Sequence, residues 1–553
     1  MRIKRTGLSL LGILSIMLFT GTAMAQITYD WATGMGGQTV NAQVIDIASD
    51  PQGNTYITGE FEGTKSFGPF TLTSTGTSAV YVAKYNASGV CQWAIKGGAN
   101  FSSANAGGVA FNNGYVYATG HFVNTINFGL GNVLADGFSD VFVVKLDPID
   151  GTAQWVIKMG GSVIDKAYAI CANSAGGVFV TGTFSGTGNF GSNQLNSGNL
   201  NNINLFVANI NDAGSCSWAI QAGNTVSEDL AYDIAQSPNG DLILSGFFYS
   251  PASFGGVTAT GIPGGPDLFL ASFNPSNGNT KWVSTGGSDG GDWGNGIGFD
   301  PNNNIYISGF IGDTATFGPY TIPDNGYGNI FVGKFNSNGV VQWVKSNGSI
   351  SNDAGLDIVT DFGGSSYITG YVTATANFDG TFLTGTQLKD AFVCKYATNG
   401  TLRWVTRIGG PGFDTGHSIF FNQNGKVTVA GEFFGNVSIG GTLVSAPSGE
   451  YSAFITKMGG GTVGLNESTE LELEVFPNPT ADNLNILLPE LNDAMVTLDI
   501  MDLQGKLIHS EAITLNSSNQ QHVVDVTTFS PGNYLLRIDT STGIYGTKVL
   551  IAR

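Results

Sequence analysis

Few side chains in this sequence belong to the types that perform nucleophilic or acid–base chemistry. Among 553 residues there are only four histidines and four cysteines. They are His121, His417, His509 and His522, with Cys91, Cys171, Cys216 and Cys394. This set offers few bases for a catalytic triad, and the absence of a CxxC pair or a histidine cluster leaves zinc without ligands. We therefore expect no enzymatic activity, no metal and no cofactor.

One acidic position recurs along the chain, ahead of a short run of small residues. It is occupied by Asp165, Asp229, Asp292, Asp353 and Asp414. A carboxylate there can accept backbone N–H bonds from the following turn, so we interpret these aspartates as structural. The alternative is a ring of carboxylates that binds Ca²⁺ near an axial opening. That ring would be incomplete, because Ala42 and Ala104 take the place of the aspartate in two units.

Just after the recurring aspartate, one slot varies more than a structural position needs to. It holds Tyr168, Tyr232, Asn295, Leu356 and His417, and Trp293 lies beside it in one unit. Exposed aromatic rings and an amide could stack on and hydrogen-bond a glycan or a peptide. We take Tyr168, Tyr232, Trp293, Asn295 and His417 as candidate binding residues. The alternative is that Trp293 only packs between units.

These positions belong to a repeat of about 62 residues, marked by a recurrent tryptophan. The tryptophans are Trp31, Trp93, Trp155, Trp218, Trp282, Trp343 and Trp404. Each unit contains a small-residue strand such as 46–48, a β-branched and aromatic run ending in Gly such as 56–59, and a closing strand such as 80–84. The patterns alternate with period two and lack a helical period, which indicates short antiparallel strands.

A sheet of this size cannot bury both of its faces alone, and radial stacking of copies covers them. We therefore predict an all-β fold, with a seven-bladed β-propeller over residues 26–461. The Asp-Ile-Ala strand is expected to lie innermost and the Trp strand outermost. The strand around Trp31 should complete the last blade beside Phe454–Lys457, which removes an open sheet edge. An open β-solenoid is the alternative.

The units also carry a family resemblance. Residues 165–170, 229–234 and 292–297, with the glycine turns and Tyr-Ile-Thr-Gly-like strands that follow them, resemble the bacterial β-propeller repeats called SBBP repeats. The similarity spans roughly residues 27–460. It implies a propeller and no particular activity.

The N-terminal residues have the pattern of a secretory leader. Arg2, Lys4 and Arg5 precede the apolar run 8–19, which ends in the small-residue site Ala23–Ala25. We predict a signal peptide over residues 1–25, because the apolar run is too short to be preferred as a membrane anchor. No later segment has the length of a transmembrane helix.

After a polar linker at 462–470, residues 471–553 contain about seven short strands and suggest a small Ig-like β-sandwich. Several short motifs in this segment resemble the type A sorting domain of the type IX secretion system. The residues that carry the resemblance are Pro477, Asn478, Pro479, Gly505, Lys506, Gly532, Tyr534 and Lys548. The resemblance implies a translocation signal whose partner is the outer-membrane translocon. The alternative is a generic sandwich that shields the propeller or binds sugar.

The composition narrows the possible partners. The formal net charge is −19 and only 11% of residues are charged, which disfavours nucleic acid and anionic membranes. We expect a secreted or cell-surface monomer that acts as a non-enzymatic binding or adhesion module, with a glycan or a surface protein as its ligand. The alternatives are an extracellular polysaccharide-processing enzyme and a structural component of the cell-surface layer.

Overall fold

The computed structural model describes residues 27–38, 42–224, 227–323, 326–386, 388–422, 425–446, 450–459, 474–477, 480–487, 495–502, 507–514, 521–539 and 544–552. Every regular element in these ranges is a β-strand, which confirms the all-β prediction. The signal peptide and the linker at 462–470 lie outside the described residues. So do Asn478, Pro479, Gly505, Lys506 and the side chain of Lys548.

The described part of residues 29–459 contains seven antiparallel sheets with four main strands each, which we number 1 to 7 in chain order; a hairpin extends sheets 2 and 3 to six strands. In each sheet the strands follow one another from the inside outward. Sheet 1 has β3 (Ala42–Ser49), β4 (Thr55–Phe61), β7 (Ala79–Tyr85) and β8 (Cys91–Gly97); sheet 2 has β9 (Ser103–Asn112), β10 (Tyr115–Val123), β13 (Asp140–Leu146) and β14 (Ala153–Gly161); sheet 3 has β15 (Lys166–Ala172), β16 (Val178–Ser185), β19 (Ile203–Ile210) and β20 (Cys216–Gly223).

The remaining sheets repeat this order. Sheet 4 has β21 (Leu230–Gln236), β22 (Leu242–Phe248), β25 (Asp267–Phe273) and β26 (Thr280–Gly286); sheet 5 has β27 (Asp292–Phe299), β28 (Ile305–Ile311), β31 (Asn329–Phe335) and β32 (Val341–Asn347); sheet 6 has β33 (Ala354–Thr360), β34 (Ser366–Val372), β37 (Asp390–Tyr396) and β38 (Leu402–Ile408); sheet 7 has β39 (Asp414–Phe421), β40 (Lys426–Phe434), β43 (Tyr451–Gly459) and β1 (Tyr29–Gly34).

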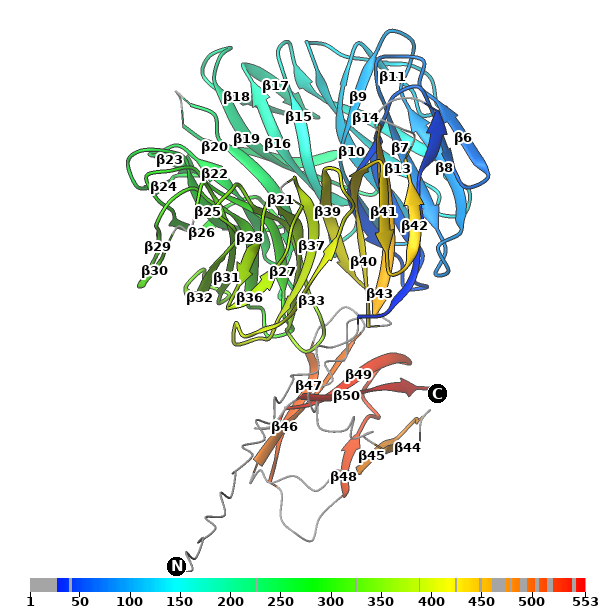
Figure 1. Ribbon diagram of the computed structural model, residues 1–553, viewed down its shortest axis with the longest axis vertical. Helices are drawn as coiled ribbons and strands as arrows, with labels where there is room; N and C mark the ends of the chain where they lie inside the picture. The colour runs from blue at the N-terminus through cyan, green and yellow to red at the C-terminus, as the bar shows by residue number, and fades with distance from the viewer. Residues whose placement is uncertain are drawn as a thin grey trace, which may run out of the picture.

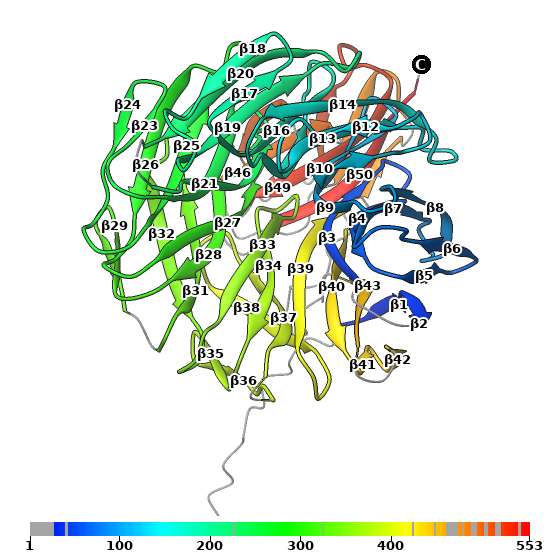
Figure 2. The same ribbon diagram turned by 90° about the horizontal axis from the view of Figure 1, so that it is seen from above.

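The seven sheets form a ring around a common axis (Figure 2). Each inner strand contacts the inner strand of the next sheet, and β39 contacts β3, so the ring is continuous. The hydrophobic core consists of layers between neighbouring sheets; in one layer Ile243 and Leu270 of sheet 4 pack against Ile307 and Phe331 of sheet 5. Small residues on the inner strands allow the sheets to converge near the axis.

The N-terminal strand closes the ring. β1 pairs antiparallel with β43, and Trp31 lies opposite Lys457. Sheet 7 is therefore built from both ends of the ring, with its outer strand supplied by the beginning of the described chain. This pairing covers the edge of β43, which would otherwise be open to another strand.

A two-stranded hairpin leaves each sheet between its second and third strands. These hairpins are β5–β6 (Thr64–Phe67, Phe70–Thr73, with β2, Gly36–Gln38, alongside), β11–β12 (Thr125–Ile126, Val133–Leu134), β17–β18 (Thr187–Phe190, Asn193–Asn196), β23–β24 (Ala252–Phe254, Val257–Ala259), β29–β30 (Ala315–Phe317, Tyr320–Ile322), β35–β36 (Ala376–Phe378, Thr381–Leu383) and β41–β42 (Asn436–Ile439, Thr442–Ser445). Several of them pair with the outer strand of the preceding sheet, as β17 does with β14 and β23 with β20. The hairpins therefore tie neighbouring sheets together.

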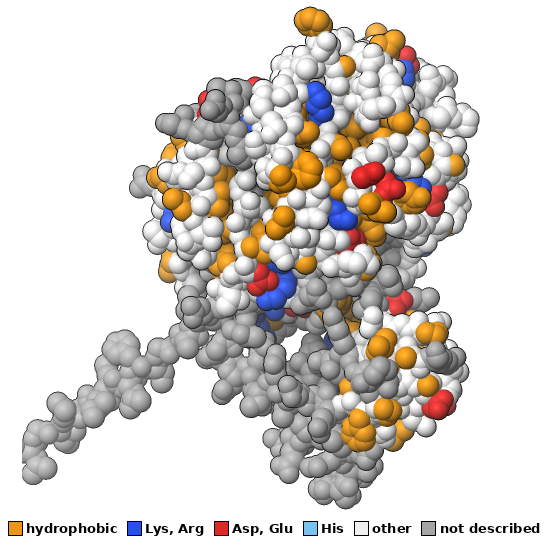
Figure 3. Space-filling model, turned by 90° about the vertical axis from the view of Figure 1, so that its right-hand side faces the viewer, with side chains coloured by type: hydrophobic (Ala, Val, Ile, Leu, Met, Phe, Trp, Pro, Cys, Tyr) orange, Lys and Arg blue, Asp and Glu red, His pale blue; other side chains and the backbone are white. Residues whose placement is uncertain are grey.

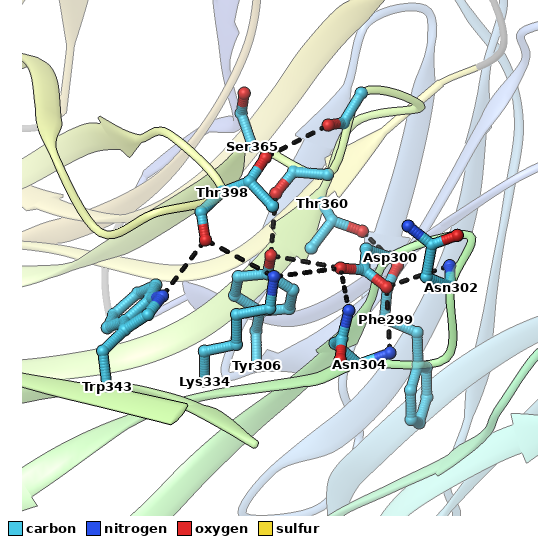
Figure 4. Close-up of polar contacts among 12 residues, drawn as sticks. Phe299, Asp300, Asn302, Asn304, Tyr306, Lys334, Trp343, Thr360, Ser365 and Thr398 are labelled. Atoms are coloured by element: carbon cyan, nitrogen blue, oxygen red, sulfur yellow. Dashed lines mark hydrogen bonds and ion pairs between the residues drawn. The ribbon is translucent and has the colours of Figure 1, made fainter. Parts of the chain in front are cut away.

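The recurrent tryptophans lie on the outer strands and clamp each sheet to the next. The Trp93 indole N–H donates to the carbonyl oxygen of Pro148, and Trp343 donates to Thr398, over 3.1 Å in both cases. Around the Trp343 clamp, Asp300 accepts the backbone N–H groups of Asn302 and Asn304 and forms an ion pair with Lys334 (3.4 Å; Figure 4). The carbonyls that accept the indole bonds belong to the turn between the third and fourth strands of the next sheet.

We call the end of the ring at which the inner strands begin the upper face, and the opposite end, which carries these short turns, the lower face. The C-terminal residues lie below the lower face (Figure 1). They form one sheet of β44 (Glu474–Phe476), β45 (Asn483–Leu487) and β48 (Gln521–Asp525), and a second of β47 (Leu507–Thr514), β46 (Met495–Asp502), β49 (Gly532–Asp539) and β50 (Ile544–Ile551). Their apolar side chains make a separate core, which includes Leu498, Leu536 and Val549.

Among the residues that the structure describes, no helix has the length and apolar character needed to span a membrane.

Candidate functional site

The variable slot is the position of a β-bulge in the inner strands. Register shifts fall at Tyr168 in β15, Tyr232 in β21, Asn295 in β27, Leu356 in β33 and His417 in β39. A bulged residue has no direct partner on the neighbouring strand, and its side chain is re-aimed relative to the pleat. The slot residues therefore lie within the inner strands rather than in the connections that precede them.

Three of the candidate residues meet in a row of aromatic rings on the upper half of sheets 3 to 5. The Tyr168 and Tyr232 ring centroids are 6.4 Å apart, and Phe247 lies 5.8 Å from Tyr232 and 6.3 Å from Trp293. Trp293 stacks on Phe310 at 4.5 Å. We call these five residues the aromatic arc.

The arc combines buried and accessible rings. Phe247 and Phe310 are buried, whereas Tyr168, Tyr232 and Trp293 are half-buried and keep part of their surface accessible. Burial raises the pKa of Tyr232 to about 12, with smaller effects from Tyr168 and Glu228. The two tyrosines are therefore neutral at physiological pH, and the arc presents uncharged aromatic surface supported from behind by phenylalanines.

The other two candidates are not part of this arc. The Asn295 side-chain amide donates to the carbonyl oxygen of Gly355 in sheet 6, over 2.8 Å. His417 lies on sheet 7, where its Nε2 is 3.5 Å from Glu432 Oε1. Asn295 therefore links two sheets, and His417 lies beside a carboxylate.

A polar cleft lies between sheets 7 and 1. Its volume is about 440 Å³, and its lining includes Glu60, Glu432, Lys389, Phe413 and Tyr451. The repeat pattern does not mark this group, because Glu60 and Glu432 are spaced like ordinary repeat residues after the Gly of a second strand. Their shared repeat position, in neighbouring sheets of a closed ring, is the signal that could have identified them.

The two carboxylates of the cleft are held differently. Gln43 donates its side-chain amide to one oxygen of Glu60 over 2.6 Å, and Asn105 donates to the other. Burial still raises the pKa of Glu60. Burial also acts to raise the pKa of Glu432, but His417 and Lys389 outweigh it and hold that pKa below its ordinary value. Because both oxygens of Glu60 accept amide bonds, this carboxylate serves as an anchored acceptor.

The recurring aspartates are fully buried and accept backbone N–H bonds. Asp229 accepts from Asn224 over 2.6 Å and from Tyr249 over 2.8 Å, and Asp292 accepts from Ser288 over 2.6 Å and from Gly312 over 3.2 Å. The donors lie in the connection before the inner strand and at the end of the second strand. The following turn is not the donor, because it lies at the opposite end of that strand.

A different set of aspartates lines the axis. Asp46, Asp233 and Asp357 come from sheets 1, 4 and 6, and each accepts the N–H of the next residue over 2.7 Å. The second oxygen of each accepts an N–H from the following sheet over 2.8 Å. Ser418 bridges Asp46 and Asp357. In all three, burial raises the pKa, to about 6 for Asp46 and about 7 for Asp233.

These axial carboxylates bond to backbone amides and so lock neighbouring sheets together. Within the described ranges, no group of three or more His, Cys, Asp or Glu side chains is arranged to hold a metal ion. The chemistry that the upper face offers is therefore aromatic stacking on one side of the axis and hydrogen bonding to anchored carboxylates on the other.

Comparisons with known proteins identify the C-terminal region. Residues 474–552 match the secretion system C-terminal sorting domain. This confirms the predicted sorting domain, and it indicates export to the cell surface or the extracellular space. The SBBP-type repeat stays a prediction.

One curated relative matches part of the ring. It is an uncharacterized WD repeat-containing protein, L264, of Acanthamoeba polyphaga mimivirus, 25% identical over 319 residues. The match covers 51% of this chain and only 19% of that protein. The chain therefore spans about a fifth of that relative's length.

Solved structures with a similar arrangement are distant. Quinohemoprotein alcohol dehydrogenase from Comamonas testosteroni has a TM-score of 0.39 at 10% identity, with 82% of this chain and 79% of that chain covered. A europium-containing methanol dehydrogenase has a TM-score of 0.35 at 11% identity, with 73% and 80% covered. At such scores no activity transfers to this chain, and its function has to be argued from its own upper face and its sorting tail.

Proposed function

We propose that the chain is an exported seven-bladed β-propeller that binds a neutral glycan on its upper face without cleaving it. In this proposal the seven sheets are the blades, and the β1–β43 pairing closes the ring. The C-terminal region is a small Ig-like sandwich that carries the protein through the type IX secretion system. The Tyr534 hydroxyl, which donates to the Ser530 carbonyl over 2.7 Å, supports this by its likeness to the tyrosine corner of Ig-like sandwiches.

The aromatic arc is the observation that carries the binding proposal. Sugar rings present C–H groups that pack well on the faces of aromatic side chains, while Tyr and Trp polar atoms hydrogen-bond the hydroxyl groups. Trp293 and Tyr232 expose part of their rings and come from adjacent blades, so a chain of sugar units can contact both. Rigid backing by Phe247 and Phe310 lowers the entropy lost on binding.

The charge of the molecule favours a neutral ligand. The net charge of −19 repels anionic polymers in general, and the arc contains no Lys or Arg. The surface seen in Figure 3 consists mainly of uncharged side chains, with charged residues widely scattered. Neutral polysaccharide is therefore a better fit than nucleic acid or acidic polymer.

A glycan array screened with the mature chain tests the proposal. We expect binding to a neutral polysaccharide that weakens about tenfold in Trp293→Ala, equivalent to roughly 1.4 kcal/mol. Tyr320→Ala is the matched control, because this tyrosine lies on the outer hairpin of the same blade, away from the axis. Equal binding by the two variants, or no binding to any glycan, would contradict the proposal. Release of reducing ends would indicate a polysaccharide-cleaving enzyme.

The role of the C-terminal region in export can be tested separately. Removal of residues 474–552 is expected to retain the chain inside the cell envelope, whereas the full chain reaches the surface or the medium. Fractionation followed by immunoblotting distinguishes these outcomes. Equal export of both chains would show that residues 474–552 are not the export signal.

A further inference from the structure

Each recurring aspartate lies close to a residue of the preceding blade. That neighbour is the first or second residue of the preceding blade's third strand. The neighbouring residues are Asp140 with Asp165, Asn204 with Asp229, Asp267 with Asp292, Asn329 with Asp353, and Asp390 with Asp414. A glycine covers each pair: a Cβ on Gly160 would lie 2.4 Å from Asp140 Oδ1 and 2.6 Å from Asp165 Oδ2. Three blade junctions therefore bury two acids together, and two junctions bury an acid with an amide.

The first two acid pairs lack a donor between them. Asp140, Asp165 and Asp267 are fully buried, and Oδ1 of each has no hydrogen-bond partner among the described residues. The other oxygen of each carboxyl accepts a backbone N–H, from Gly161 to Asp165 over 2.6 Å and from Ile262 to Asp267 over 2.9 Å. Asp140 and Asp267 thus each bring an oxygen without a hydrogen-bond partner to an acid–acid junction, which leaves room for one proton.

Neighbouring charges do not neutralise these two pairs. Near Asp140, Lys158 is already paired with Asp136 over 2.6 Å, and near Asp292 the additional charged group is Asp313, another acid. The third pair is different, because Arg407 donates to Asp390 over 2.9 Å. At the third junction the guanidinium of Arg407, which is partly exposed, thus supplies the positive charge that the other two junctions lack.

We propose that the Asp140–Asp165 and Asp267–Asp292 pairs each hold one shared proton in the folded protein, so that these blade junctions are acid-stabilised locks that weaken in alkaline surroundings. Two carboxylates buried side by side cannot both stay ionised without a large cost, and a shared proton removes one of the two charges and gives Oδ1 of Asp140 or of Asp267 a partner. The proton is taken up from the solvent when the blades pack and is released when they separate.

The direction of the pH effect follows from the carboxyl groups. Burial, and then the neighbouring acid, raises the pKa of Asp165 and of Asp267 to about 7, above the ordinary value of 3.8. A group with a raised acid pKa is protonated in the folded state and ionised in the unfolded state between these values. Each pair therefore makes its full contribution to stability below about pH 4. Between about pH 4 and pH 7, each unit rise in pH lowers the folding equilibrium constant by up to about tenfold per pair.

The blades themselves supply matched variants for the test. Asp140→Asn with Asp267→Asn converts both junctions to the acid–amide type already present at Asn204–Asp229. Asn204→Asp makes the reverse change and creates a third acid pair without an arginine. Asn338→Asp, in an exposed lower-face turn, controls for the added charge alone. The axial aspartates contribute the same background in every variant.

Thermal and urea unfolding of the full chain at pH 5 to 8 gives the readout. We expect the double variant to lose less stability than wild type as the pH rises, and Asn204→Asp to lose more, while Asn338→Asp follows wild type. Infrared difference spectra between pH 5 and 8 should show a protonated-carboxyl band that the double variant reduces. Parallel stability curves for all variants, with an unchanged band, would overturn the proposal.

Discussion

At the residue scale, a glycine in each of the six turns between third and fourth strands touches the tryptophan of the preceding sheet. Gly151 has φ +78°, and a Cβ there would lie 2.8 Å from the Trp93 ring. The backbone needs glycine for its left-handed conformation, and the clamp needs it for contact with the indole. These two requirements explain why glycine turns accompany the tryptophans along the sequence.

Alanine substitution can separate the two requirements. Gly114 has the same φ of +78°, with no atom within 4 Å of the place a Cβ would take. Gly114→Ala should cost only backbone strain of about 1–2 kcal/mol, and Gly151→Ala a further 1–3 kcal/mol for displacing Trp93. Urea unfolding of both variants gives the two values. Equal losses of unfolding free energy in the two variants would show that the contact between Gly151 and Trp93 is not tight.

The residues of the candidate site were only partly predictable. Tyr168, Tyr232 and Trp293 stand out in the sequence because they vary within a fixed repeat, and the structure brings them together. Phe247 joins them only through strand pairing, which places it opposite Leu230 on the inner strand. Asn295 and His417 occupy the same slot, but Asn295 bonds to a carbonyl of the next sheet and His417 lies 3.5 Å from a carboxylate, which the repeat pattern alone does not reveal.

At the element scale, the indole hydrogen bonds of Trp31, Trp93, Trp155, Trp218 and Trp343 each join an outer strand to the next sheet. Trp404 differs from these five: its Nε1 has no hydrogen-bond partner among the described residues, although the ring is as buried as that of Trp93. The reason is the topology of sheet 7, whose third strand β43 is followed by β1 from the other end of the ring. No turn between third and fourth strands exists there to supply the accepting carbonyl.

This difference predicts a pair of unequal substitutions. Trp93→Phe removes the indole hydrogen bond to the Pro148 carbonyl, which keeps only its bond from Lys84 Nζ, and this loss should cost about 1 kcal/mol more than Trp404→Phe. Both substitutions remove the same ring area, so the difference between their losses of unfolding free energy isolates the contribution of the hydrogen bond. Equal unfolding midpoints for the two variants would show that the indole bonds contribute no net stability.

The elements themselves follow from the sequence to different degrees. The four main strands of each unit can be predicted from the sequence, because alternating apolar residues and glycine turns recur with the same spacing as the tryptophans. The β-bulges are not, since a bulge is set by the register between two strands rather than by either strand alone. The acid pairs were missed for the same reason: Asp140 is 25 residues from Asp165 and belongs to another unit.

At the scale of the whole molecule, the ring depends on its two ends meeting. β1 covers the edge of β43 and donates its tryptophan to the turn of sheet 1, where the Trp31 indole bonds the Ala87 carbonyl over 3.0 Å. A chain that begins at Gly36 should therefore have a lower unfolding temperature and should aggregate, because an open edge strand pairs with other chains. A chain that begins at Ile27 is the control. Light scattering and calorimetry that show identical behaviour would mean that closure by β1 is dispensable.

The central claim is that a glycan binds at the aromatic arc, and the eight tryptophans permit a direct measurement. Seven are the repeat clamps on outer strands, and Trp293 alone belongs to the arc. In ¹⁹F NMR of protein labelled with 5-fluorotryptophan, the resonance absent from Trp293→Phe is that of Trp293. Titration with the neutral glycan that binds on the array should shift this resonance and leave the other seven in place. A saturable binding curve during which the Trp293 resonance stays unmoved would contradict the account.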